Sequence, residues 1–297
     1  MKIKQLLITF CDYSLYIKGY SPHTIRGYKN IVNCFCRISE IDDIEDVSDE
    51  LVKKLFYKGR IERNWSSSTF IVYHKILKVF FRWCVKNDYL EDNPTDDIEV
   101  PRLEKRLPPK LTRQEAMRLL EVAYHYPYKY RFLRYRNHAI FATILFAGLR
   151  KKEVLGLKYA DVDLENRSIF IRQGKGSKDR VIPASSRLVE ILSIYLTERQ
   201  RLNKTCPEFF ASLNRDMGLT DTGIRRLVKK IREASGITFS LHKLRHTFAT
   251  LMLEGGCDIY SLSKMMGHSD IKTTTIYLAA SAEHLRKQII KHPLNDL

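Results

Sequence analysis

Residues 240–250, SLHKLRHTFAT, read as the start of a helix, and they place four side chains that can carry positive charge on its first turns. These side chains are His242, Lys243, Arg245 and His246. The N-terminal end of a helix carries partial positive charge and favours anions, whereas cations are favoured at the other end. Cations gathered at a helix start therefore predict that an anion from outside the chain binds there. His242 and Arg245, three residues apart, share one face of this helix.

Three further stretches contain residue types that could act on a phosphate. They are FAGLRKKEV (146–154), GKGSKDR (174–180) and MMGHSDIKTTTIYLA (265–279). The first ends an apolar helix and continues with Arg150 and Glu153 on one face of the next helix. The second carries Lys175 between two glycines, which let a backbone approach another chain closely. The third supplies His268 and Tyr277, so the four stretches together offer a set of cations and one phenol.

These residue types meet the chemical needs of phosphodiester transfer. A phosphodiester has one negative charge and gains another in its pentacovalent transition state. Two arginines can clamp the non-bridging oxygens with forked donors, and histidines can donate hydrogen bonds or move protons near neutral pH. A lysine can protonate a departing oxygen, and a tyrosine phenolate can be the nucleophile. Stabilising charge where it develops is usually the largest catalytic contribution, so a DNA phosphate fits the expected anion.

Each stretch by itself also has an ordinary structural explanation. Arg150 and Glu153 could form a helix-end ion pair, and Tyr277 could be a packing residue. The hairpin lysine could lie on a solvated turn. His242 and His246 have the i, i+4 spacing of metal ligands, but HKLRH lacks the acidic residue of the H-E-x-x-H pattern, so a metal site is disfavoured.

The charge of the chain predicts a polyanionic partner. The 297 residues carry a formal net charge of +17, with 51 Lys and Arg against 34 Asp and Glu, and an isoelectric point near 9.6. Residues 1–98 hold 15 basic and 14 acidic residues, which leaves 36 basic and 20 acidic residues in the other 199. Nucleic acid is the first candidate and an anionic membrane surface the second. A basic surface without a partner is the remaining alternative.

Composition excludes several other classes of protein. Hydrophobic residues make up 44% and aromatic residues 11% of the chain, which is enough for a core and argues against disorder. No apolar run reaches the roughly 18 residues that a membrane span needs, and the N-terminal segment lacks the pattern of a signal peptide. The six cysteines form no CxxC pair. We therefore expect reduced, buried thiols in a cytoplasmic protein rather than a zinc or redox site.

The chain divides into a helical first part, a basic linker and a second, mainly helical domain. We expect the helical part over residues 1–99, a proline-rich linker over 100–111 and the second domain over 112–297. A capping box that begins at Thr112 marks the start of that domain. Apolar residues on both sides of the 174–180 tip predict a β-hairpin. The predicted fold class is mainly α with a small β-hairpin or sheet.

Several helices can be placed from their apolar spacing and their capping residues. In the first helix, apolar residues recur at helical spacing at Leu6, Leu7, Phe10, Tyr13 and Ile17. A second helix is predicted after Ser21, which serves as its cap, with Pro22 at the first helical position. A long amphipathic helix follows in SSSTFIVYHKILKVFFRWCVKNDYL (66–90).

The last segment predicts a short strand followed by a helix. TTIYL (274–278) looks strand-like, and Leu285, Ile289 and Ile290 form one apolar face of a helix after it. An isolated helix this short is marginal in water and needs a surface to pack on. We expect residues 281–297 to dock on a neighbouring protomer.

With these motifs the chain resembles the tyrosine recombinase (phage integrase) family, and most closely its small Xer-type members. GLRKKEVLGL, GKGSKDRVIP, LHKLRHTFAT and MMGHSDIKTTTIY occur in the family's order and at its spacing, and the resemblance covers nearly the whole length. SPHTIRGYKNIVNCF is similar to part of the family's core-binding domain. The resemblance implies a SAM-like core-binding domain over residues 1–99 and an α+β catalytic domain over 112–297 with a C-terminal subunit-exchange helix.

The resemblance also implies roles for individual residues. The catalytic set is Arg150, Lys175, His242, Arg245, His268 and the nucleophile Tyr277, with Glu153 in support of Arg150. Lys175 would be the general acid for the leaving 5′ oxygen. The DNA-binding residues expected around this set are Lys151, Lys152, Lys178, Arg180 and Lys243. Lys151 and Lys152 stand where small or apolar residues are commoner in the family, and they add positive charge beside Arg150.

A member of this family would be a site-specific DNA recombinase. Tyr277 would attack a scissile phosphate to give a 3′-phosphotyrosyl intermediate and a free 5′-OH, and two rounds would pass through a Holliday junction without metal, ATP or another cofactor. The implied partner is a double-stranded DNA recombination site, which a dimer would bind. A homotetramer would hold two such sites, and a second recombinase or an accessory activator could be a further partner. The alternatives are a type IB topoisomerase-like nicking-closing enzyme, which has less use for the C-terminal helix, and a non-catalytic DNA-binding regulator.

Overall fold

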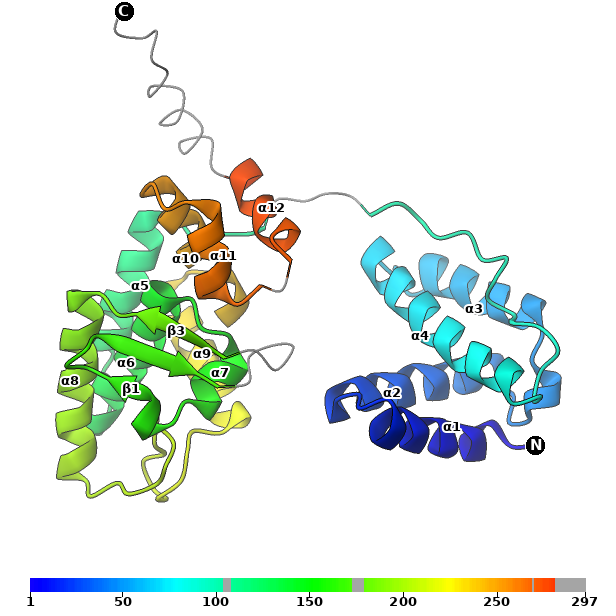
Figure 1. The fold of residues 1–297 in the computed structure, drawn as a ribbon, viewed down its shortest axis with the longest axis horizontal. Coiled ribbons are helices and arrows are strands. Elements are labelled where there is room, and N and C mark those ends of the chain that lie inside the picture. Colours follow the sequence, from blue (N-terminus) through cyan, green and yellow to red (C-terminus); the bar gives the residue numbers. More distant parts are fainter. Residues whose placement is uncertain (104–107, 173–178, 269, 281–297) are drawn as a thin grey trace, which may run out of the picture. The chain divides into compact units, whose positions relative to one another are not determined.

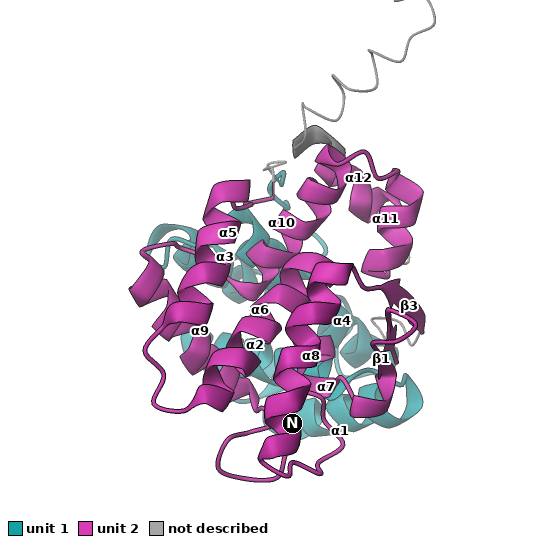
Figure 2. Cartoon of the chain, turned by 90° about the vertical axis from the view of Figure 1, so that its left-hand side faces the viewer, with its two compact units in different colours: residues 1–105 teal, residues 106–297 magenta. Residues whose placement is uncertain are grey.

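The structure is a computed structural model of the chain, and it describes residues 1–103, 108–172, 179–268 and 270–280. The chain forms two compact units, residues 1–105 and residues 106–297 (Figure 2). Each unit has a hydrophobic core of its own. Among the residues that the structure describes, none of the helices combines the length and apolarity of a membrane span.

The first unit is a helical bundle. Its elements are α1 (Ile3–Asp12), a π-helical turn (Tyr13–Ile17), α2 (Pro22–Ser39), a 3-10 turn (Ile44–Asp46), α3 (Asp49–Ile61) and α4 (Ser67–Lys86). The side chains of Ser21, Ser48 and Ser66 each accept a hydrogen bond from a backbone N–H of the first turn of α2, α3 and α4. The helix after Ser21 and the long helix within 66–90 are therefore confirmed, and α2 packs against α1, α3 and α4.

The apolar face of the first helix ends earlier than its sequence predicts. Leu6, Leu7 and Phe10 are at most 4% exposed, but Ile17 is 73% exposed. The π-helical turn over 13–17 rotates the chain less per residue than an α-helix does. Spacing based on 3.6 residues per turn therefore places Ile17 on the apolar face of the helix, whereas the structure exposes its side chain.

The second unit consists mainly of helices, and α6 lies in its core. The helices are α5 (Arg113–His125), α6 (Arg131–Ala147), α7 (Lys151–Gly156), α8 (Ser186–Arg201), α9 (Asp221–Ser235), α10 (Leu241–Glu254), α11 (Ile259–Met266) and α12 (Lys272–Ala280), with a 3-10 turn at Tyr159–Asp161. The capping box between Thr112 and Glu115 is present at the start of α5. α6 packs against α5, α8 and α10, so it is apolar on several sides.

A three-stranded antiparallel sheet lies beside these helices (Figure 1). It consists of β1 (Val162–Asp163), β2 (Ser168–Ile171) and β3 (Arg180–Pro183), in that order. Ile169 pairs with Ile182 in the predicted hairpin, and both side chains are at most 1% exposed. The hairpin is thus confirmed, and a first short strand extends it. The tip over 173–178 lies outside the described residues, with Lys175 and Lys178 in it.

The two ends of the second unit differ from the sequence-based expectations. Leu111, expected in the linker, is 1% exposed in the core of the second unit, and its backbone N–H donates to the Thr247 hydroxyl at 2.8 Å. At the other end, residues 272–280 form α12 rather than the predicted strand. α12 packs on α10 and α11, and Thr274 and Tyr277 share its buried face. The predicted helix over 281–297 lies outside the described residues.

Candidate active site

The start of α10 positions Arg245 in the interior of the second unit. Ser240 caps the helix by accepting from the Lys243 N–H at 3.0 Å. Arg245, 3% exposed, donates from Nη1 to the Gly148 carbonyl and from Nη2 to the Met266 carbonyl. These carbonyls end α6 and α11, where backbone oxygens carry partial negative charge. Burial, and then Arg150, lowers the pKa of Arg245 to about 9, which leaves the side chain charged at neutral pH.

Arg150 lies at the N-terminus of α7, and it binds both α7 and the turn after α11. Its backbone N–H and its Nη1 donate to the two carboxylate oxygens of Glu153, at 2.7 and 2.8 Å. Its Nη2 donates to the carbonyl of Gly267 at 3.0 Å, although 117 positions separate the two residues in sequence. The predicted pairing of Arg150 with Glu153 is therefore confirmed, and the structure adds a contact to the turn after α11.

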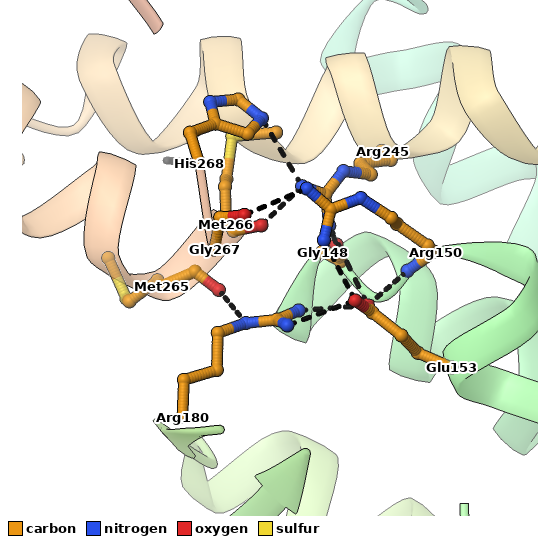
Figure 3. A network of polar contacts seen from close by, with 9 residues as sticks. All are labelled: Gly148, Arg150, Glu153, Arg180, Arg245, Met265, Met266, Gly267 and His268. Atoms are coloured by element: carbon orange, nitrogen blue, oxygen red, sulfur yellow. Dashed lines mark hydrogen bonds and ion pairs between the residues drawn. The ribbon is translucent and has the colours of Figure 1, made fainter. Parts of the chain in front are cut away.

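Glu153 is the anion on which three arginines converge (Figure 3). Arg180 donates to both of its oxygens at 2.9 and 2.8 Å, Arg150 binds it as described above, and Arg245 Nη1 lies 3.9 Å from Oε2. Burial by itself would raise the pKa of Glu153, but hydrogen bonds from Arg180 and Arg150 outweigh it and hold the pKa at about 2. One carboxylate among three guanidinium groups leaves an excess of positive charge, which suits the binding of an anion.

The position of Arg180 corrects an expectation from the sequence. We expected Arg180 to contact DNA from the hairpin, but its side chain is only 8% exposed and points into the unit. Besides Glu153, it donates from Nε to the carbonyl of Met265 at 2.8 Å. Its three hydrogen bonds join β3 to α7 and α11, so Arg180 positions other groups of the cluster.

The turn after α11 brings His268 to the arginines. Gly267 ends the helix with φ of 62°, and a Cβ there would lie 2.9 Å from Nη1 of Arg180. In His268, Nε2 is 3.4 Å from Nη2 of Arg245 and Nδ1 is 2.7 Å from the Thr274 hydroxyl. Because a guanidinium only donates, Nε2 accepts and the proton sits on Nδ1. Burial and the nearby arginines lower the pKa of His268 to about 4, so the imidazole is neutral at neutral pH.

Tyr277 lies against α10 with its hydroxyl in contact with a histidine. Its side chain is 2% exposed, and Nδ1 of His246 is 2.7 Å from the phenolic oxygen. The rings of His246 and His242 meet edge to face, with centroids 4.1 Å apart. Burial raises the pKa of Tyr277, although Arg245 and Arg150 act in the opposite direction. The nucleophile expected from the sequence is thus a buried, protonated phenol in this structure.

Of the other predicted residues, the structure describes His242, Lys151, Lys152 and Lys243. His242 is exposed on the first turn of α10, and it lines a cavity of about 370 Å³ together with Lys151. Lys151 also forms an ion pair with Asp221 at 2.6 Å. Lys152 is exposed, and the Lys243 ammonium donates to the Thr238 carbonyl at 2.9 Å. Within the described part of the chain, no three His, Cys, Asp or Glu side chains gather as a metal-binding group.

Two members of the site were not identified from the sequence. Thr274, 0% exposed, holds His268 but stands in a run of threonines that gives no hint of its partner. His246 was counted among the cations at the helix start and, with His242, as a disfavoured metal-binding pair, but it was given no catalytic role. Its position directly after Arg245 and one turn after His242 was the available signal, because residues one turn apart share a helix face.

Known proteins with similar sequences place the chain in a family. The model of the phage integrase family matches residues 109–284, and that of the N-terminal SAM-like domain of phage integrases matches residues 7–91. The chain is 31% identical to tyrosine recombinase XerC of Oceanobacillus iheyensis, over 96% of this chain and 95% of that protein. It is 33% identical to tyrosine recombinase XerA of Thermococcus onnurineus, over 93% and 92% of the two chains.

Solved structures agree in fold. The crystal structure of XerA recombinase is 26% identical, with a TM-score of 0.54 over 98% of both chains. The post-cleavage complex of XerH site-specific recombinase with a palindromic difH substrate has a TM-score of 0.75 at 23% identity, over 96% of this chain and 83% of that one.

The chain belongs to the phage integrase family. Within it, the chain is a tyrosine recombinase of the Xer type, an enzyme that carries out site-specific DNA recombination.

Proposed function

We propose that this chain cleaves and rejoins duplex DNA with Tyr277 as the nucleophile. The catalytic set that we assign is Arg150, Lys175, His242, Arg245, His268 and Tyr277. The observation that carries the assignment is the convergence of Arg150 and Arg245 on one buried carboxylate, with His268 in contact with Arg245. An excess of fixed positive charge, already in place before DNA binds, favours a transition state that gains negative charge.

Arg150 and Arg245 are suited to binding the two non-bridging oxygens of the scissile phosphate. Each terminal nitrogen of a guanidinium carries two hydrogens. The bonds from Arg150 to Glu153 and Gly267 use one hydrogen on each nitrogen. Arg245 donates from Nη1 to the Gly148 carbonyl and from Nη2 to both the Met266 carbonyl and His268, which leaves one hydrogen on Nη1. Both side chains can therefore stay anchored while they donate to a phosphate.

The proposed reaction is an in-line transfer of the phosphoryl group. A bond forms between the Tyr277 oxygen and phosphorus, and the bond from phosphorus to the 5′ oxygen breaks. Lys175, assigned from the family resemblance, gives its proton to the departing oxygen. His242 donates a hydrogen bond to the phosphate, and His268 accepts from Arg245 and so helps to orient that guanidinium. The phosphotyrosyl linkage keeps the energy of the phosphodiester, so rejoining to the 5′-OH of a partner strand needs neither ATP nor metal.

We also propose the assembly that recombination requires. Residues 1–99 form the core-binding domain and residues 112–297 the catalytic domain, with residues 281–297 as the segment that links protomers. Lys151, Lys152, Lys178 and Lys243 contact the DNA backbone. XerH and lambda integrase were crystallised on DNA, the latter as a dimer on a core site. We infer a dimer on each site and a homotetramer over two sites, acting in the cytoplasm, with or without an accessory recombinase.

A strand-exchange assay with two labelled duplexes tests this function. The duplexes carry a site selected from random-sequence DNA by its binding to the protein. We expect recombinant products and a Holliday junction intermediate in the presence of EDTA and without ATP. Relaxation of supercoiled plasmid without exchange would contradict the proposal, because it would indicate a nicking-closing enzyme.

A further inference from the structure

The hydroxyl of Tyr277 has a specific partner outside the proposed catalytic set. His246 lies on α10, one residue after Arg245, and it is 8% exposed. Its Nδ1 is 2.7 Å from the phenolic oxygen, which is a short hydrogen bond. The ring of His242 contacts the same imidazole edge to face. The orientation of His246 is therefore fixed by one residue of α10 and one of α12.

Attack on phosphorus requires that the phenol lose its proton. A free phenol has a pKa of about 10, and burial raises that of Tyr277. Hardly any phenolate is present at neutral pH, so a proton acceptor within hydrogen-bond distance is needed. His246 meets this need, because burial, and then His242 and Arg245, lowers its pKa to about 4 and leaves it neutral. His268 does not, since its two nitrogens face Arg245 and Thr274.

We propose that His246 is the general base of the cleavage step, an inference that rests on Tyr277 being the nucleophile. As the bond between the Tyr277 oxygen and phosphorus forms, the phenolic proton moves to Nδ1 of His246. The bond from phosphorus to the 5′ oxygen breaks, and that oxygen takes a proton from the general acid. In rejoining, the 5′-OH attacks phosphorus and gives its proton back to the general acid, while the bond from phosphorus to the Tyr277 oxygen breaks and the protonated His246 returns its proton to that oxygen. No proton is gained or lost over the cycle.

Bound DNA would strengthen His246 as a base. The groups that face it are His242 and Arg245 on α10, Tyr277 on α12 and His268 before α12. Apart from Tyr277, these groups are cationic or become cationic when protonated, so they oppose a positive charge on His246. A phosphate brings negative charge to the same place, and a nearby anion raises the pKa of an imidazole. His246 therefore becomes a better proton acceptor only when substrate is present.

Two substitutions separate proton transfer from hydrogen bonding. In His246→Asn the amide occupies the region of Nδ1 and can still bond to the phenol, but it does not accept a proton at neutral pH. In His246→Ala the imidazole is deleted, which leaves space for free imidazole. The readout is the single-turnover rate of covalent complex formation on a nicked suicide duplex, with duplex binding measured in parallel. His138→Asn, which replaces another partly buried histidine on α6, is the matched control.

We expect both His246 variants to cleave roughly 10²- to 10⁴-fold more slowly, the usual range for a lost general base, with duplex binding within about twofold of normal. Imidazole should accelerate His246→Ala but not the His138→Asn control. Raising the pH from about 7 to about 9 should accelerate His246→Asn more than the unaltered protein, because hydroxide then takes the proton.

Two results would overturn the role of His246. The first is a normal rate for His246→Asn, which would show that hydrogen bonding alone suffices. The second is a slow His246→Asn that high pH does not restore, which would indicate a packing role; this result decides the question even if His246→Ala does not fold. If the unaltered protein forms no covalent complex, the assignment of Tyr277 fails, and this outcome is distinct from both.

Discussion

Arg180 donates one hydrogen bond to each carboxylate oxygen of Glu153, at 2.9 and 2.8 Å, across 27 positions of sequence (Figure 3). The same guanidinium binds the carbonyl of Met265 at 2.8 Å. Through these bonds, one strand residue fixes the helix start that holds Arg150 and the helix end that precedes His268. The relative positions of the site's cations therefore depend on a residue that is itself buried.

Loss of the charge on Glu153 should destabilise the second unit. In Glu153→Gln, three arginines lose their common anion, and removing one partner of a buried ion pair typically costs about 3 to 5 kcal/mol. The control is Glu190→Gln, which breaks a pair of the same i, i+3 spacing whose side chains are 57% and 62% exposed. The control should change the free energy of unfolding by less than about 1 kcal/mol. Equal losses of unfolding free energy in the two variants, measured by urea titration, would contradict the structural role that we assign to Glu153.

An alanine at position 267 should destabilise the protein by more than the backbone strain that its positive φ causes. Gly267 and Gly236 have φ of 62° and 68°, but a Cβ would lie 2.9 Å from Arg180 Nη1 at the first and more than 4 Å from other atoms at the second. Both alanine variants share a backbone cost of about 1 to 2 kcal/mol. Gly267→Ala should lose about 1 kcal/mol more, from the clash, and should cleave DNA more slowly. Indistinguishable unfolding curves and rates would refute this reading.

The hydroxyl of Thr274 should matter for the rate of cleavage, whereas that of its neighbour should not. Thr274→Val removes the partner of His268 Nδ1, while Thr275→Val removes a hydroxyl that donates to the Lys272 carbonyl on an exposed face. Loss of one ordinary hydrogen bond of about 1 kcal/mol predicts a roughly five- to tenfold slower single-turnover rate for Thr274→Val. Equal rates in the two variants would show that Thr274 does not orient His268.

Acid should destabilise the second unit well above the pH at which its carboxylates titrate. His138, His246 and His268 have pKa values of about 4, below their ordinary value of 6.5, mainly because of burial. A group with a lowered pKa binds its proton first in the unfolded chain, so its stabilising effect is present above pH 6.5 and is lost as the pH falls toward 4.

Glu153, with its pKa lowered from 4.5 to about 2, adds a second loss below pH 4.5. Each histidine contributes a slope of up to about 1.4 kcal/mol per pH unit in the free energy of unfolding. Removing one of them in His138→Asn should flatten the curve between pH 6.5 and 4. An unchanged slope in that variant would contradict the cause that we assign.

Local signals in the sequence were enough to place many of the elements. Ser21 and Thr112 each cap a helix with the residue type and spacing that the pattern requires, and the isoleucines of β2 and β3 alternate as a half-buried hairpin does. Arg150 and Glu153 interact within one turn, so their contact could also be predicted. These features depend on neighbours within a few residues.

Contacts between distant elements could not be predicted in this way. The pairing of Arg180 with Glu153 depends on how β3 packs against α7, and a lysine- and glycine-rich tip suggested an outward arginine instead. The β-branched residues in TTIYL favour a strand, but packing of Thr274 and Tyr277 against α10 overrides that preference. The contact between Tyr277 and His246 likewise appears only when α10 and α12 are packed together.

The most direct test of the account is the fate of Tyr277 on DNA. A nicked duplex that loses its 5′-OH fragment after cleavage traps the covalent complex, and proteolysis followed by mass spectrometry locates the attached nucleotide. We predict that the adduct maps to Tyr277, and that Tyr277→Phe binds the same duplex with nearly unchanged affinity but forms no adduct. An adduct on another residue, or a covalent complex formed by Tyr277→Phe, would contradict the account.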